Sequence, residues 1–358
     1  MKQTVTIDRK DWGVTPQGRA VDLYTLENGP LKAEISTYGG ALVSLFTPDR
    51  DGVPGNVVLG FSDLAGYLDH DWYCGCLVGR VANRLADSSF ELDGKQYTVT
   101  ANHGPHQLHG GPQGFNSRVW AADAAYTRQG PSLALSLVSP DGDQGYPGEL
   151  RVTAVYTLAE DALLLEFLAE ADQPTPVNLT HHAYFNLTAD TGADCLGHQL
   201  TLRSSQYLAT DPAQIPTGEV KDVGGTPFDF RGETAIGERV AADDEDIRYG
   251  KGYDHCFVLD NDGKTSERAA RVREPVSGRV LELYTDMACV QFYSGNHLPP
   301  NTPGRDGAVY TTHSGFCLEP QGYVDAPNQP GFPQVTLRPE EKFRARVQFR
   351  VTTEPGKG

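Results

Sequence analysis

The sequence lacks several features that would place the protein in other functional classes. No apolar run in its 358 residues approaches the length of about 18 that crosses a membrane, and the first twelve residues, MKQTVTIDRKDW, have no apolar core for a signal peptide. Lys and Arg number only 30 against 47 Asp and Glu, so the net charge is −17. An acidic chain suits neither nucleic-acid phosphates nor anionic membranes, whereas a neutral small molecule is compatible with it. We therefore expect a soluble, cytoplasmic protein without nucleic-acid or membrane partners.

Cysteine is scarce as well. Six cysteines do not make a disulfide framework in a chain of this length; Cys74 and Cys76 form a C-x-C and the others are scattered. We expect most of them to be buried small hydrophobic residues in a reducing compartment. The segment NHGPHQLHGG repeats His103, His106 and His109 at every third residue, but its Pro and Gly prevent a helix that would bring them to one face. No Cys or His pair elsewhere has zinc-finger spacing, so we expect no metal site.

Helical patterns are few, and alternating patterns dominate. Residues 150–158 and 343–352 place apolar side chains at every second position, as strands with one buried face do. Asp93-Gly94 and Ser277-Gly278 each separate two such runs and predict hairpins.

Only residues 234–246, as a short helix, and 63–68, as a single turn, are compatible with helix. With 39 Gly and 24 Pro distributed along the chain, the pattern favours an all-β fold, a large antiparallel β-sandwich. No clean linker or internal repeat interrupts it, so we expect one domain over residues 1–358.

Polar and aromatic side chains are concentrated in residues 176–187, PVNLTHHAYFNL. In a strand, His181 and His182 point to opposite faces, so one should face whatever the sheet encloses and the other should face away. Tyr184 and Asn186 share the face of His182, and an imidazole, a phenol and an amide in one row suit a pocket for a hydroxylated small molecule. The alternative is a strand whose polar residues only hydrogen-bond to neighbouring loops.

Four further segments carry polar groups suited to a binding site. In GRVANR, Asn83 and Arg84 offer hydrogen bonds, and an arginine fork binds two hydroxyls or steadies a carboxylate; the alternative is a surface salt bridge. His109 precedes two glycines, which let the backbone approach a ligand closely. Asp254 is either an acceptor for sugar hydroxyls or the cap of a turn. Glu319 follows three largely apolar residues; burial there would raise its affinity for a proton, whereas a strand-end position would leave it in solvent.

Taken together, these segments resemble the aldose 1-epimerase (galactose mutarotase) family nearly end to end. The matching strings, in order, are YTLEN, STYGG, FTPDRDG, VVLGF, GRVANR, LHGG, NLTHHAYFNL, GYDHCF, VQFYSGN and GFCLEPQGYVDAPNQP. The resemblance implies a β-sandwich with a sugar-binding cleft and interconversion of the α and β anomers of free aldohexoses such as galactose and glucose, without a cofactor. It also implies His182 as catalytic acid, Glu319 as catalytic base and His109 as the residue that holds and polarises the sugar. Substrate contacts are implied for Asn83, Arg84, Asp254 and Gln291.

Three positions depart from the pattern of many members, which have Asn at His181, Ser at Ala183 and Thr at Pro320. None removes a proposed catalytic group, although each affects how the site is supported. Two alternative functions are a non-catalytic sugar-binding module and a glycosidase, which ordinarily needs two carboxylates; Glu319 and Asp254 are the candidates. The sequence leaves open the preferred aldose and the choice between a monomer and a homodimer.

Overall fold

The computed structural model describes residues 5–190 and 192–355. Strands dominate, and in this described part the only α-helices are α1 (Leu64–Asp69) and α2 (Glu245–Gly250). Neither helix is long and apolar enough to span a membrane. Helix α1 is the single turn expected at 63–68; it begins because the Asp63 carboxylate accepts a hydrogen bond from the Gly66 amide at 3.1 Å.

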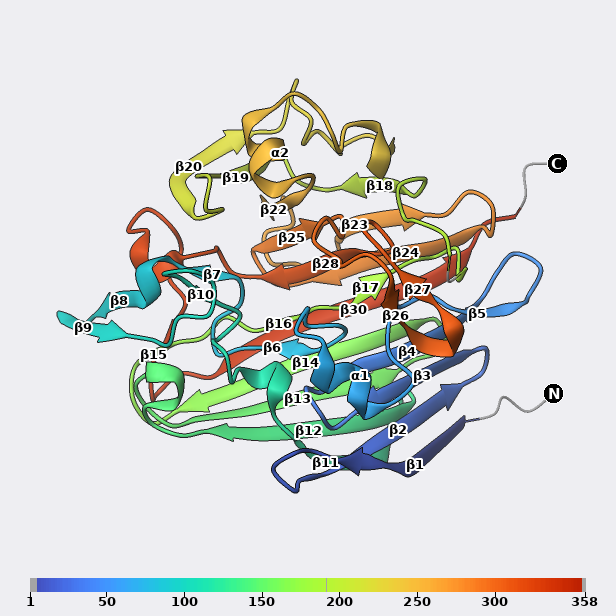
Figure 1. Ribbon diagram of the computed structural model, residues 1–358, viewed down its shortest axis with the longest axis horizontal. Helices are drawn as coiled ribbons and strands as arrows, with labels where there is room; N and C mark the ends of the chain where they lie inside the picture. The colour runs from blue at the N-terminus through green and yellow to red at the C-terminus, as the bar shows by residue number, and fades with distance from the viewer. Residues whose placement is uncertain (1–4, 191, 356–358) are drawn as a thin grey trace.

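The largest sheet has nine antiparallel strands and forms one layer of the molecule (Figure 1). Its strands, in spatial order, are β11 (Ala121–Tyr126), β12 (Pro131–Ser139), β13 (Leu150–Leu158), β14 (Ala162–Ala171), β30 (Phe343–Thr353), β24 (Arg279–Thr285), β23 (Arg268–Arg273), β18 (Gln199–Leu202) and β21 (Thr234–Ala235). The two alternating segments are therefore strands β13 and β30, as predicted. On the outer face of β30, Arg350 pairs with Asp161 at 2.7 Å, while Val347 and Phe349 are buried.

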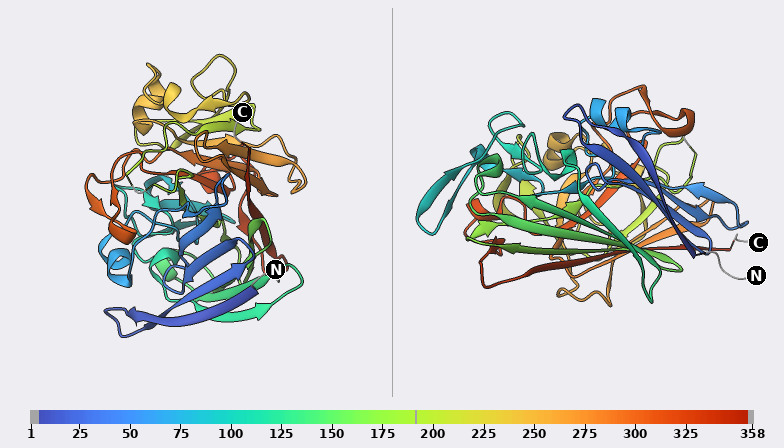
Figure 2. Two further views of the ribbon diagram at one scale, coloured as in Figure 1. Left: turned by 90° about the vertical axis from the view of Figure 1, so that its right-hand side faces the viewer. Right: turned by 90° about the horizontal axis from the view of Figure 1, so that it is seen from below.

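Two further sheets cover the inner face of the nine-stranded sheet. The six-stranded sheet contains β17 (Tyr184–Phe185), β28 (Phe316–Gln321), β25 (Cys289–Tyr293), β22 (Asp254–Val258), β19 (Gln206–Thr210) and β20 (Pro216–Asp222). The five-stranded sheet contains β1 (Val5–Val14), β2 (Ala20–Asn28), β3 (Leu31–Ser36), β4 (Leu42–Pro48) and β5 (Pro54–Asn56). Figure 2 shows these blue N-terminal strands crossing the green strands of the nine-stranded sheet at an angle.

Apolar side chains join the layers into one core. Phe185 of β17 contacts Phe349 of β30 with ring centroids 5.1 Å apart. Tyr156 of β13 reaches the N-terminal region, where its hydroxyl donates to the Gly40 carbonyl at 2.8 Å. The inward faces of all three sheets contribute to a single buried cluster. The fold is thus the all-β sandwich that the alternation indicated.

Five two-stranded ladders account for the remaining strands in the part of the chain that the structure describes. They are β6 (Leu77–Val78) with β16 (Thr180–His181), β7 (Arg84–Leu85) with β10 (Gln107–Leu108), β8 (Ser89–Leu92) with β9 (Lys95–Thr98), β15 (Thr175–Pro176) with β29 (Thr336–Leu337), and β26 (Thr302–Pro303) with β27 (Val309–Tyr310). The predicted Asp93-Gly94 hairpin is confirmed, with φ of 52° and 77° at the two turn residues. The Ser277-Gly278 turn likewise separates the paired strands β23 and β24.

The prediction of a helix over residues 234–246 is wrong. The first of these residues form strand β21 and then a 3₁₀ turn, Ile236–Glu238, whose amides pair with a neighbouring loop: Ile236 donates to the His198 carbonyl at 2.9 Å and Gly237 to that of Leu196 at 2.8 Å. These tertiary bonds replace the bonds within a helix. Helix α2 begins only after Asp244, whose carboxylate caps it.

Candidate active site

A cavity of about 370 Å³ opens beside the six-stranded sheet and the β7–β10 ladder. Six of the seven residues selected from the sequence line it: Asn83, Arg84, His109, His182, Asp254 and Glu319. The seventh, Gln291, is buried behind the wall and is not in contact with the open space. Residues that are far apart in the sequence are therefore brought to one site.

The two adjacent histidines do point to opposite faces. His181 ends β16 and is fully buried against Tyr156 and Phe349, with ring centroids 5.8 and 5.9 Å away. His182 follows it and faces the cavity. Its backbone amide donates to the Cys76 carbonyl at 2.9 Å, so the position of the ring is set by the neighbouring β6 segment. The alternation expected of a strand is confirmed at this pair.

Glu319 meets His182 across the cavity floor. It lies in β28, where β25 pairs with it through Gln291, while β17 pairs only with the first two residues of the strand. Its Oε1 is 3.6 Å from Nε2 of His182, and both side chains are buried. On the other side of the imidazole, the Cys317 sulfur is 3.6 Å from Nδ1. An imidazole and a carboxyl group therefore lie in contact with one face toward an open cavity.

His109 presents a hydrogen-bond donor to the same cavity. It follows β10 with a left-handed φ of 52°, and Gly110 and Gly111 continue with φ of 85° and 95°. The Asn83 amide donates to its Nδ1 at 3.1 Å, so the neutral ring carries its proton on Nε2. One nitrogen each of His109 and His182 and a carboxylate oxygen of Glu319 lie within 4.8 Å of one another, close enough to bind a single metal ion. A metal also needs a lone pair from each ligand, and the neutral His109 ring offers N–H instead.

A carboxylate held by three donors forms the opposite wall. Asp254, at the start of β22, accepts from Gln291 Nε2 at 2.7 Å, Gln214 Nε2 at 2.9 Å and Arg84 Nη2 at 3.4 Å. Arg84 is in turn held by Asn83, whose Oδ1 accepts from its backbone amide at 2.8 Å. Gln291 thus supports Asp254 from behind, which is why it does not line the cavity.

Comparison with known proteins places this site in a family. A family profile described as aldose 1-epimerase matches residues 22–350. Human galactose mutarotase is 42% identical over 348 residues, which are 97% of this chain and 99% of the human protein. Escherichia coli aldose 1-epimerase is 37% identical over 345 residues, 95% of this chain and 98% of the relative. The chain belongs to the aldose 1-epimerase family.

Solved structures of the aldose 1-epimerase family share the fold. A galactose 1-epimerase from Lactobacillus acidophilus superposes with a TM-score of 0.85 at 26% identity, covering 98% of this chain and 99% of that one. The aldose epimerase homologue from C. elegans gives a TM-score of 0.82 at 29% identity, covering 98% of this chain and 99% of that one. The resemblance read from the ordered motifs is thereby confirmed.

Burial sets the charge of the acid–base pair in this aldose 1-epimerase family member. Desolvation raises the pKa of Glu319 well above its usual range, and the nearby Asp254 charge adds to the effect. Desolvation also lowers the pKa of His182 to about 4. Burial therefore favours the neutral forms of both groups, with the transferable proton on Glu319. Burial acts on Asp254 as well, but Arg84 and the amide of Gln291 outweigh it and hold the pKa of that carboxyl below its usual value.

Several cavity residues were not found by the sequence reasoning. Aromatic rings line much of the wall, and Tyr73 stands next to His109 and His182 with ring centroids 4.5 and 5.9 Å away. Gln214 was also missed, because a glutamine in a turn carries no local sign of its partners. Of the three departures from the family pattern, Ala183 and His181 are buried and Pro320 accepts a hydrogen bond from the Thr180 hydroxyl at 2.7 Å.

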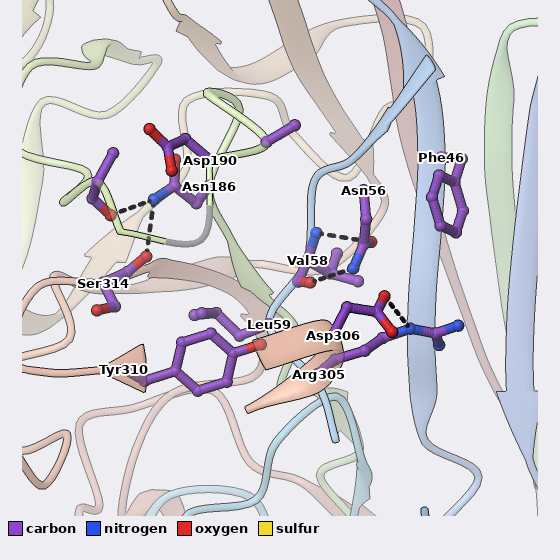
Figure 3. A pocket seen from close by; sticks show the side chains of 12 residues that line it. Phe46, Asn56, Val58, Leu59, Asn186, Asp190, Arg305, Asp306, Tyr310 and Ser314 are labelled. Atoms are coloured by element: carbon purple, nitrogen blue, oxygen red, sulfur yellow. Dashed lines mark hydrogen bonds and ion pairs between the residues drawn. The ribbon is translucent and has the colours of Figure 1, made fainter. Parts of the chain in front are cut away.

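The expected row of His182, Tyr184 and Asn186 is only partly correct. Tyr184 lines the active-site cavity, but Asn186 lines a second cavity of about 210 Å³ (Figure 3). There its amide donates to the carbonyls of Ala193 and Ser314, both at 2.9 Å. The reason is that β17 ends at Phe185, so the alternation does not continue to Asn186. Among the described residues lining this second cavity there is no histidine beside a carboxylate.

Proposed function

We propose that this protein interconverts the α and β anomers of free aldohexoses such as galactose and glucose, with His182 and Glu319 as the acid–base pair. The observation that carries the proposal is the 3.6 Å contact between His182 Nε2 and Glu319 Oε1 at the floor of a polar, aromatic cavity. The relatives that match nearly the whole chain are a galactose mutarotase and an aldose 1-epimerase.

The reaction requires two coupled proton transfers. Glu319, as carboxylate, takes the proton of the C1 hydroxyl; the C1–O5 bond breaks with its electron pair going to O5, and His182 protonates O5. Rotation about the C1–C2 bond presents the other face of the C1 carbonyl. Closure then runs the same transfers in reverse, with Glu319 returning its proton to O1 and His182 recovering its own. No redox step or electron sink is needed.

One proton shift converts the neutral pair that burial favours into the reactive pair. Moving a proton from Glu319 to His182 across their 3.6 Å contact creates a carboxylate and an imidazolium. Sugar oxygens favour these charged forms because they replace part of the lost water. His109 donates through Nε2 to a sugar oxygen, while Arg84 and Asp254 hold ring hydroxyls. A positioned acid–base pair supplies roughly 10²–10⁴-fold acceleration for such transfers.

Polarimetry tests the proposal. Added protein is expected to speed the change in optical rotation of freshly dissolved α-galactose and α-glucose, and a panel of aldoses gives the preferred sugar. A non-catalytic binding module would bind sugar without speeding the change. A glycosidase would release reducing sugar from an aryl glycoside; the three hydrogen bonds already made to Asp254 disfavour it as the second catalytic carboxylate.

Location and assembly remain predictions. A cytoplasmic location is supported by the cysteines, since all six are free and buried. A monomer or a homodimer is compatible with the site, because every group named above comes from one chain.

A further inference from the structure

Gln214 occupies the active-site wall in a position that its backbone holds firmly. It lies in the turn between β19 and β20 with a left-handed φ of 60°. Its amide donates to the Asp211 carbonyl at 2.8 Å, and the Asp211 carboxylate accepts from the amides of Ala213 at 2.8 Å and Ile215 at 3.0 Å. These bonds fix the turn, so the buried side chain of Gln214 is aimed into the site rather than into solvent.

The Gln214 side chain bridges two charged residues of opposite sign. Its Oε1 accepts from Arg84 Nη2 at 2.7 Å, and its Nε2 donates to Asp254 Oδ2 at 2.9 Å. The direct contact between Arg84 and Asp254 is longer, at 3.4 Å. A primary amide is suited to this place because it is uncharged and offers both an acceptor and a donor.

Counting hydrogen bonds shows what the bridge leaves free for a ligand. Each carboxylate oxygen accepts about two hydrogen bonds. Asp254 Oδ2 receives two, from Gln214 and Arg84, whereas Oδ1 receives one, from Gln291. One acceptor position therefore remains on Asp254, at Oδ1. The two protons of Arg84 Nη2 are likewise directed to Gln214 and Asp254, so Arg84 reaches a sugar hydroxyl only through its other N–H groups.

We propose that Gln214 is a positioning residue that sets sugar affinity and hydroxyl specificity by orienting Asp254 and limiting it to a single sugar hydroxyl. The inference rests on the proposed function, since it treats the cavity as a sugar site. Gln214 acts before the chemical step: it holds the carboxylate and the guanidinium in the geometry that the bound sugar requires. Its side-chain hydrogen bonds go to Arg84 and Asp254 and not to His182 or Glu319, so we expect the proton transfers not to depend on it.

Three variants test this inference by polarimetry and by calorimetric titration with galactose. Gln214→Met keeps the side-chain volume and removes both hydrogen bonds; we expect KM and Kd to rise about tenfold, equivalent to ~1.4 kcal/mol of binding, with kcat within threefold of wild type. Gln214→Glu keeps the bond from Arg84 but places a carboxylate beside Asp254. Ala213→Ser, an exposed change in the same turn, is the matched control and should leave all constants unchanged.

The pH dependence of Gln214→Glu separates positioning from a structural role. At pH 8 the introduced carboxylate repels Asp254, so galactose should bind at least tenfold more weakly than to wild type. At pH 5.5 the two carboxyls share one proton, which restores the donor to Asp254, and most of the affinity should return. Deoxygalactoses, each lacking one ring hydroxyl, test specificity. For one of these sugars, the loss of affinity relative to galactose should be smaller in Gln214→Met than in the wild type; for the others it should be the same in both proteins.

The outcomes distinguish the two proposals. A wild-type protein that binds galactose without accelerating mutarotation refutes the proposed function, while Kd values still decide the role of Gln214. Unchanged KM and Kd in Gln214→Met, or a fall in kcat with KM unchanged, overturns the inference about Gln214. If circular dichroism shows that Gln214→Met does not fold, the test rests on Gln214→Glu. A galactose affinity of this variant that is equally low at pH 8 and pH 5.5 overturns the inference. Absence of both sugar binding and acceleration in the wild type refutes both.

Discussion

Replacing Glu319 by Gln should remove most of the activity and stabilise the fold at the same time. The substitution keeps the shape of a buried side chain and removes only its ability to exchange a proton. Loss of the base is expected to reduce kcat by about 10²–10⁴-fold, which corresponds to ~3–5 kcal/mol of barrier. Because O1 can no longer lose its proton to the protein, the remaining acceleration comes from positioning and from His182 alone.

The effect on stability has the opposite sign. Burial raises the pKa of Glu319, so the folded state binds this proton more tightly than the unfolded chain, in which a glutamate titrates near pH 4.3. The contribution of Glu319 to the free energy of unfolding therefore falls as the pH rises above about 4.3. Glutamine does not ionise, so Glu319→Gln should have the higher thermal midpoint at pH 8, and its advantage should shrink toward pH 4.

A second buried glutamate provides the matched control. Glu34 lies in β3, away from the cavity; its Oε2 accepts from the Ser44 hydroxyl at 2.7 Å and pairs with Arg305 at 2.6 Å. Burial raises the pKa of Glu34, but Ser44 and Arg305 outweigh it and the net pKa is lowered. Its stabilising effect is present above the unfolded pKa and is lost as the pH falls through the folded pKa. Glu34→Gln should therefore lower the thermal midpoint at pH 8 and leave mutarotation within twofold.

Polarimetry and thermal denaturation at pH 4, 6 and 8 measure both effects on the two variants. The reasoning would be refuted if Glu319→Gln kept more than a tenth of the wild-type kcat. It would also be refuted if this variant melted below the wild type at pH 8, because the carboxyl would then stabilise the fold rather than strain it.

Three other substitutions test the structure. His182→Asn should lower kcat by about 10²-fold or more, while calorimetric galactose affinity stays within about tenfold; an active variant would exclude His182 as the acid. Burial lowers the pKa of His181 to about 3, so the unfolded chain takes up this proton first and the wild type should lose about 2 kcal/mol of stability by pH 5. Urea titrations at pH 7 and 5 should show that His181→Asn no longer has this loss. An equal loss in the wild type and the variant would contradict the prediction. Arg80 is buried and donates to the carbonyls of Pro147 and Gly148 at 2.8 and 2.9 Å, so Arg80→Lys should cost about 3 kcal/mol or more; an unchanged thermal midpoint would show that lysine replaces it.

Local patterns in the sequence were sufficient for much of the fold. Alternation predicted β13 and β30, because a strand with one buried face needs an apolar side chain at every second residue. Asp93-Gly94 predicted its hairpin, since both turn residues need a positive φ. The prediction was wrong over 234–246, where amides bond to residues distant in the sequence, and at Asn186, where a two-residue strand ended early.

The same distinction between local sequence pattern and tertiary packing applies to the candidate active site. Motifs in the sequence by themselves identified the candidate residues and, through their order, the family. Only the tertiary structure decided that Gln291 supports Asp254 from behind, that His109 is a donor at Nε2 and that Gln214 bridges Arg84 and Asp254. It also decided that burial favours the neutral forms of Glu319 and His182. Periodicity and turn chemistry depend on neighbours along the chain, whereas hydrogen-bond partners and pKa values depend on which side chains the packed sheets bring together and how much water they exclude.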